Sequence, residues 1–224
     1  MVLWRTLRVF NFSYLMALCL TCSTTTIRKV DLNCISLPKK QELSLDSRAH
    51  KFSVEIESKD MSDRDYDKIL VAGYLAGIVV KTEKFRQAVF NYEYNGYKGF
   101  TKTNLSNEQV YEKIIEGAEL YNGRANRTME FIAQTFEPNK GDKDDENTIA
   151  FVRRGGRHVS FSTKYLYQNA PRKANTIMHE WLHLIGFEHE KEYTDTRGYS
   201  VPYAVGDIVQ EISYDFLKQE CWWN

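Results

Sequence analysis

The residues best placed to do chemistry lie close together in the segment His179-Glu180-Trp181-Leu182-His183. Residues four apart on a helix lie one above the other, so His179 and His183 can bind the same metal ion. Glu180 lies one step round the helix, near enough to reach a water on that ion without being a ligand. This spacing predicts a metal site on a helix, with Glu180 as the general base.

A third ligand follows the predicted helix. Gly186 lacks a Cβ and so tolerates the left-handed turn by which a chain leaves a helix. The turned chain can then return His189 to the ion as a third nitrogen ligand. Three imidazoles leave the fourth tetrahedral position open for water, which is typical of catalytic rather than structural zinc. We therefore predict that His179, His183 and His189 bind Zn²⁺.

The full pattern is more specific than its first half. His-Glu-x-x-His alone arises by chance in many helices, whereas a glycine and a third histidine in register make coincidence a poor explanation. The remaining histidines, His50 and His158, have no comparable partners in the sequence. We interpret them as ordinary polar residues.

Around these residues the sequence resembles the metzincin metallopeptidases, and locally their astacin branch. The segment 186–190, Gly-Phe-Glu-His-Glu, matches that branch's Gly-Phe-x-His-Glu ending. Upstream, Gly155-Gly156 followed by Val159-Ser160 is similar to its Gly-Gly-x-x-x-Val-Ser hairpin. The resemblance covers about residues 149–190. It implies a twisted sheet above the active-site cleft, an active-site helix beneath it and a short C-terminal lobe. It also implies that Thr148–Arg153 is an edge strand that binds substrate as an added strand.

One feature of the metzincins is missing. They carry a methionine turn under the zinc, and this chain has no methionine after Met178. Ser200-Val201-Pro202-Tyr203 resembles that turn, with Pro202 where the methionine would stand. Tyr203 lies one residue earlier than the tyrosine with which astacins contact zinc or the transition state. Two interpretations stay open for Tyr203, a catalytic hydrogen-bond donor and a packed tyrosine.

Hydrophobic patterning predicts the elements that position these residues. An alternating pattern predicts a strand at 51–57, and helical spacing predicts one or two helices within 65–91, interrupted around Gly73 and Gly77. Ser106 and Asn169 are helix caps, the first with Gln109 three residues later and the second with Pro171 in the first turn. Further strands are predicted at 129–136, 148–153 and 158–163, a charged loop at 138–147 and a final helix at 203–218. We expect one α+β domain, with the strands at 148–153 and 158–163 forming a hairpin.

The N-terminal segment has the layout of an export signal. Arg5 and Arg8 precede a short apolar run, and small polar residues follow from Thr21. We predict a signal peptide at 1–22, a tether or short pre-segment at 23–50 and the catalytic domain at 51–224. An apolar N-terminal helix of the mature fold is the alternative. Cys22 loosely fits a lipoprotein cleavage site, so the expected location is secreted, periplasmic or cell-surface, with membrane anchoring through an N-terminal lipid as one form.

Two cysteines remain after such a cleavage. Cys34 and Cys221 can close one disulfide in an exported chain. The alternative is that the Cys34 thiolate is a temporary zinc ligand, as in one metzincin branch, but the residues around it do not match that branch's motif. The disulfide is the favoured interpretation.

Composition excludes some partners and supports others. The 30 basic and 30 acidic side chains balance, so no basic surface points to nucleic acid. With 42% hydrophobic residues the chain can bury a core. We expect a monomeric zinc metalloendopeptidase that acts on protein or peptide substrates. The alternatives are a non-catalytic zinc-binding surface or adhesion protein, against which the presence of Glu180 argues, and a zinc hydrolase of a non-peptide bond.

Overall fold

The computed structural model describes residues 44–138, 147–153 and 155–216. The predicted signal peptide, both Cys34 and Cys221, and most of the predicted charged loop lie outside these residues. The predictions made for them therefore stay predictions.

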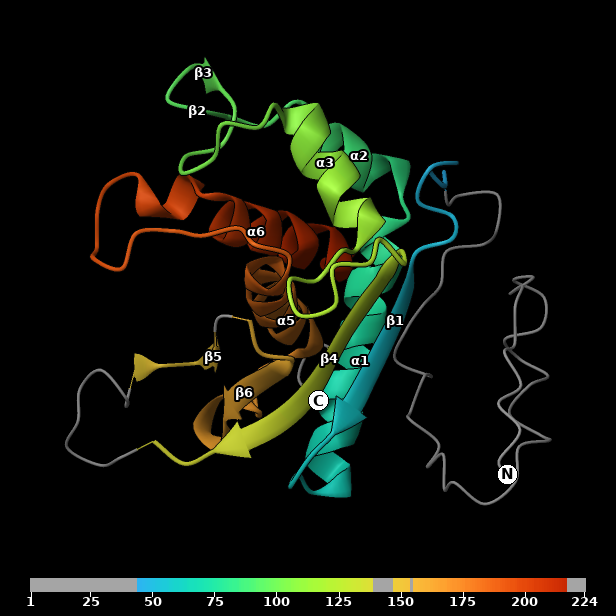
Figure 1. Cartoon of the computed structure of the whole chain (residues 1–224), viewed down its shortest axis with the longest axis vertical. Helices are drawn as coiled ribbons and strands as arrows, with labels where there is room; N and C mark the ends of the chain where they lie inside the picture. Colours follow the sequence, from blue (N-terminus) through green and yellow to red (C-terminus); the bar gives the residue numbers. More distant parts are fainter. Residues whose placement is uncertain (1–43, 139–146, 154, 217–224) are drawn as a thin grey trace. The chain divides into compact units, whose positions relative to one another are not determined.

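A four-stranded mixed sheet forms one part of the domain (Figure 1). Its strands are β1 (Ser53–Ser58), β4 (Thr128–Phe136), β6 (His158–Ser162) and β5 (Ala150–Val152), in the order β1-β4-β6-β5. The first three run parallel, whereas β5 is antiparallel to β6. The hairpin prediction is confirmed, and β5 forms the antiparallel edge of the sheet. A separate small hairpin consists of β2 (Glu93–Tyr94) and β3 (Tyr97–Lys98).

Helices complete an α+β fold, which confirms the predicted class. They are α1 (Asp63–Val80), α2 (Glu83–Phe90), α3 (Asn107–Glu116), α5 (Ala170–Leu184) and α6 (Val201–Tyr214). The region 65–91 forms two helices because Thr82 caps the second, accepting a bond from the Phe85 backbone. Ser106 and Asn169 cap α3 and α5 as predicted, Ser106 in a reciprocal capping box with Gln109. Two short 3₁₀ turns, η4 (Thr163–Tyr165) and η5 (Arg197–Tyr199), precede α5 and α6.

The glycines of α1 are close-packing positions. A Cβ on Gly73 would lie 2.4 Å from Ile56 Cδ1, and one on Gly77 would lie 2.4 Å from Val54 Cγ2. Both contacted side chains belong to β1. The helix therefore lies closer to the sheet than any larger residue would allow, and the interruption in its apolar pattern reflects packing rather than a break.

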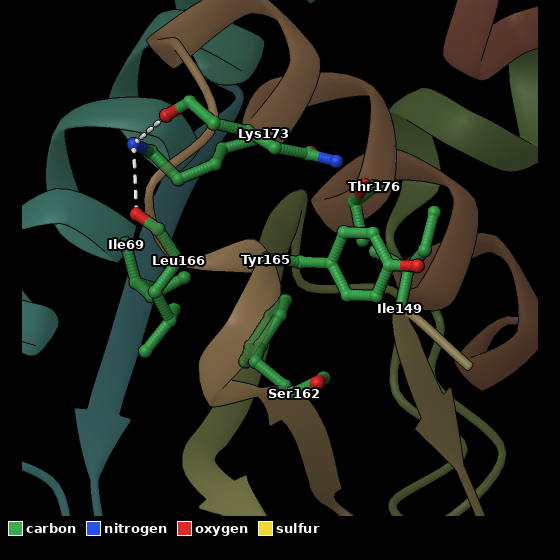
Figure 2. A pocket seen from close by; sticks show the side chains of 9 residues that line it. Ile69, Ile149, Ser162, Tyr165, Leu166, Lys173 and Thr176 are labelled. Atoms are coloured by element: carbon green, nitrogen blue, oxygen red, sulfur yellow. Dashed lines mark hydrogen bonds between the residues drawn. The ribbon is translucent and has the colours of Figure 1, made fainter. Parts of the chain in front are cut away.

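The helix that carries the histidines lies in the core. It packs against α1 and α6, and its Ile177, Met178, Trp181 and Leu182 are fully buried. Near its start, Lys173 is buried and its ammonium donates to the carbonyl oxygens of Leu166 and Gln168 (Figure 2). Burial lowers the pKa of Lys173 to about 8. These bonds fix the chain between β6 and α5. This part of the chain lines the small pocket drawn in Figure 2, and none of the three histidines is among the lining residues.

Residues just before the predicted boundary at residue 51 are also packed. Leu45 pairs with Thr82 in an isolated bridge, and Asp46 and Ala49 are buried. The hydroxyl of Tyr111 donates to the Asp46 carboxylate. The last residues of the predicted 23–50 tether or pre-segment thus pack against side chains distant in sequence. Among the described residues, no helix combines the length and the apolar character needed to cross a bilayer.

Candidate metal centre

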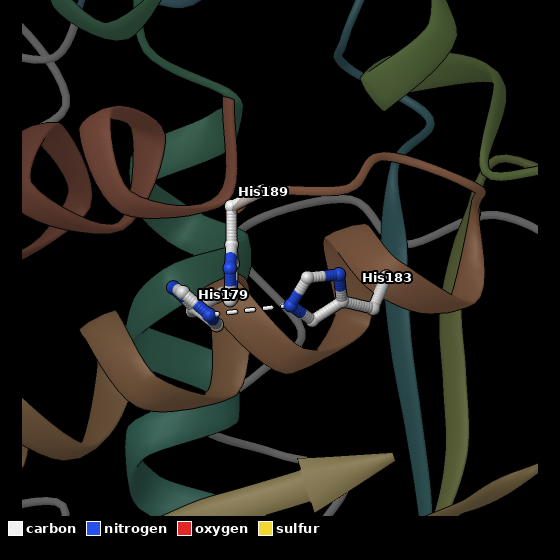
Figure 3. A group of neighbouring side chains, drawn as sticks. All are labelled: His179, His183 and His189. Carbon is white, nitrogen blue, oxygen red and sulfur yellow. Dashed lines mark hydrogen bonds between the residues drawn. The ribbon is translucent and has the colours of Figure 1, made fainter. Parts of the chain in front are cut away.

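The structure brings His179, His183 and His189 together (Figure 3). The first two project from adjacent turns of α5, as their spacing predicts. One candidate ligand atom from each of the three lies within 4.8 Å of the other two. The group could therefore hold one metal ion, in agreement with the prediction for these residues.

The turn after α5 returns His189 to the helix. Gly186 has φ +90, a conformation that favours glycine. The Leu120 backbone N–H donates to the Leu184 carbonyl at 2.8 Å, which satisfies an acceptor at the end of the helix. Below the turn, the Trp181 indole N–H donates to the buried Glu119 carboxylate at 2.9 Å. These bonds fix the end of α5 and hence the direction in which the chain leaves it.

Backbone carbonyls set the tautomers of two of the three histidines. Nδ1 of His183 lies 2.7 Å from the Phe187 carbonyl oxygen, and Nδ1 of His189 lies 2.7 Å from that of Glu190. A carbonyl only accepts, so each Nδ1 must be the protonated nitrogen. Such outer hydrogen bonds are the usual means of orienting metal-binding imidazoles and leaving Nε2 free as the ligand.

The distance between two ring nitrogens fits a shared cation. Nε2 of His183 lies 3.3 Å from Nε2 of His179. With Nδ1 of His183 protonated, its Nε2 carries a lone pair that faces the other ring. Two nitrogens bound to one tetrahedral zinc at about 2.0–2.1 Å would lie about 3.3–3.4 Å apart. The pair is therefore spaced as two zinc ligands are.

The histidines are also held in the uncharged state that a metal requires. Burial is the main cause that lowers the pKa of each, to about 2 for His179. Repulsion by His183, His189 and Arg197 lowers the pKa of His179 further, and repulsion by Arg197 does the same for His189. Metal ligands must be deprotonated, so no proton has to be removed from these rings at neutral pH.

Glu180 is buried beside the group and is not one of its members. Burial raises the pKa of its carboxyl to about 8. The charge of Glu180 in turn acts on the hydroxyl of Tyr203, so the two side chains are close enough to interact electrostatically. A cation on the histidines would favour the ionised carboxylate, because opposite charges stabilise each other.

Tyr203 packs directly against the histidines. It lies in the first turn of α6, with its ring centroid 4.5 Å from that of His179 and 4.9 Å from that of His189. The preceding residue, Pro202, is buried in the same turn. Tyr203 thus lies against the rings of the candidate metal site, whichever of its two roles it has.

The predicted substrate edge is present but shorter than expected. The strand β5 covers Ala150–Val152 of the predicted 148–153, and the Ile149 carbonyl extends the pairing by accepting from the Ser162 N–H at 2.9 Å. In the described part of the chain, β5 pairs only with β6. It also packs against α5, the helix of the histidines.

Arg197 was not found by sequence reasoning. Its guanidinium carbon lies 5.2 Å from the Tyr203 ring centroid. It reaches the site from η5, in a loop without periodicity or motif. No local signal in the sequence marks it.

Comparisons with known proteins add no assignment: no family model matches the chain, and no curated protein is similar to it in sequence. The functional argument therefore rests on the residues and their geometry.

Proposed function

We propose that the chain is a zinc-dependent metallopeptidase that hydrolyses peptide bonds within protein or peptide substrates. One observation carries the proposal. Three uncharged histidines direct nitrogen atoms to a common point, with Nδ1 of two of them bound to backbone carbonyls, and a buried glutamate lies next to them without joining them. The local resemblance to astacin-like metzincins supports the same conclusion.

Each residue has a defined task in this mechanism. His179, His183 and His189 would hold zinc, which supplies a Lewis acid and makes water a stronger acid. Glu180 accepts the proton of the attacking water and passes it to the amine nitrogen of the leaving group. Tyr203 donates a hydrogen bond to the oxygen on which negative charge develops. The free edge of β5 offers backbone groups to an extended peptide.

The proposal predicts that the purified chain, loaded with one equivalent of zinc, cleaves casein. Removal of the ion with a chelator should abolish cleavage, and zinc added back should restore it, because the proposed nucleophile is a water that zinc would activate. The measurement is the appearance of new peptide N-termini. Stoichiometric zinc without casein cleavage would instead favour the non-catalytic zinc-binding protein or a hydrolase of another bond.

Tyr203 can be tested separately from the metal. Tyr203→Phe keeps the ring that packs on His179 and His189 and removes only the hydroxyl. We expect zinc content to stay at the parent level while kcat falls by about 10²-fold, the usual cost of removing one donor to a developing oxyanion. An unchanged kcat would leave Tyr203 as a packing residue.

The place of action belongs to the same proposal. The signal-like segment 1–22 and Cys22 support export, either as a freely secreted chain or anchored by an N-terminal lipid. Sequencing the N-terminus of the native protein would decide between these forms and an uncleaved chain.

A further inference from the structure

A fixed positive charge lies one aromatic ring away from the candidate metal centre. The guanidinium carbon of Arg197 is 4.7 Å from the ring centroid of Tyr193 and 5.2 Å from that of Tyr203. Its Nη1 donates to the Lys191 carbonyl at 3.1 Å. Tyr203 in turn lies against His179. Two rings and a carbonyl thus hold the plane of the guanidinium beside the site.

This charge has no counter-ion in the part of the chain that the structure describes. None of the ion pairs there includes Arg197. Glu190, in the same loop, uses Oε1 for other partners. That oxygen accepts from the Thr196 hydroxyl and lies 3.5 Å from the Lys102 ammonium, whereas Oε2 is buried without a hydrogen-bond partner. Arg197 is therefore an uncompensated cation next to the reaction centre.

The hydrogen-bonding capacity of Arg197 is also incompletely used. Its Nε is buried and has no hydrogen-bond partner. Buried donors without a partner are rare in folded proteins, and each one needs an explanation. One cover of the guanidinium, Tyr193, is 95% exposed, so its side chain can rotate away without loss of core packing. The edge of the guanidinium that contains Nε therefore has a donor that no described residue uses.

We propose that Arg197 is a specificity residue that binds a carboxylate of the peptide substrate through this edge. This role rests on the proposed function, from which we take it that the substrate is a peptide. Arginine presents two parallel N–H donors, which match the two oxygens of a carboxylate. An amide of the same shape has no negative charge and only one acceptor oxygen. Peptides with a carboxylate near the bond to be cleaved are then preferred over their amides.

The test uses the full chain loaded with zinc and carrying Glu180→Ala, so that peptides bind without being cleaved. The ¹⁵N-labelled protein is titrated with Ac-Ala-Glu-Ala-NH₂ and with Ac-Ala-Gln-Ala-NH₂, and the Nε–H signal of Arg197 is followed by NMR. Ac-Ala-Ala-Ala with a free carboxyl terminus is compared with its amide in the same way. The first pair of peptides tests binding of a side-chain carboxylate. The second pair tests binding of the C-terminal carboxylate.

We expect the carboxylate peptide of one pair to shift the Nε–H signal of Arg197. This peptide should bind about 10- to 100-fold more tightly than its amide counterpart, as a charge-assisted hydrogen bond predicts. Arg197→Met should remove this preference. If the methionine variant does not fold, Arg197→Lys is the substitute test. It keeps the charge and should retain only part of the preference for carboxylates. Arg124→Met removes an exposed arginine of another loop and should leave the preference intact.

If the carboxylate peptides and their amides shift the Arg197 Nε–H signal equally, or if neither shifts it, the inference is wrong. The result is separable from the proposed function because nothing is hydrolysed in the titration. Casein cleavage by the parent chain without a carboxylate preference would refute this inference alone. A carboxylate preference without casein cleavage would refute the peptidase and leave Arg197 as an anion site.

Discussion

Replacing His183 with alanine should eliminate stoichiometric zinc binding. In the parent chain Nε2 of His183 faces Nε2 of His179 at 3.3 Å, and its Nδ1 is held by the Phe187 carbonyl. The substitution leaves only two imidazoles at the site. Loss of an outer-shell partner alone costs about 10- to 100-fold in metal affinity, so loss of a ligand should cost more than about 100-fold. Zinc per chain, measured by elemental analysis after dialysis, should fall from one to near zero.

A second histidine provides the matched control. His50 is exposed and lies outside the histidine group, so His50→Ala removes an imidazole without touching the site. It should keep one zinc per chain. Bound metal should also raise the unfolding temperature of the parent and of His50→Ala but not that of His183→Ala, because only a ligand that binds the native state stabilises it. Full zinc occupancy in His183→Ala would disprove the proposed ligand set.

Replacing Glu180 with alanine should separate metal binding from catalysis. Glu180 is adjacent to the proposed ligand His179 but is not one of the three residues of the candidate metal site. Zinc content should therefore match the parent. Turnover of casein should fall by about 10²- to 10⁴-fold, the contribution of a positioned general base. Parent-like turnover would mean that another residue takes the proton.

Glu180→Gln excludes a packing defect as the cause. It keeps the size of the buried side chain and removes the base, so its turnover should be as low as that of the alanine variant. In the metal-free chain, burial raises the pKa of Glu180 from 4.5 to about 8. A raised carboxyl pKa means that the native state binds the proton more tightly, and stability falls as pH rises through this interval. The metal-free glutamine variant should therefore be at least as stable as the parent at pH 8, measured by denaturant unfolding.

Local patterns in the sequence determined the elements and the ligand positions. Asn169 and Ser106 were identifiable as caps because a cap acts on backbone groups within its own turn. His179 and His183 could be placed on one face because the helical repeat relates residues four apart. The hairpin of β5 and β6 is encoded by a short glycine-containing connection between two strand-like segments. Each of these signals spans only a few neighbouring residues.

What only the tertiary structure decided involves residues distant in sequence. The parallel pairing of β1 with β4, the burial of Asp46 against Tyr111 and the position of Arg197 beside Tyr203 have no local signature. The sequence left the role of Tyr203 open because a shift of one residue re-aims a side chain. Packing of α6 on α5 brings the Tyr203 ring against His179 and His189. Such contacts arise from the joint burial of many apolar faces, and no single segment of the chain specifies them.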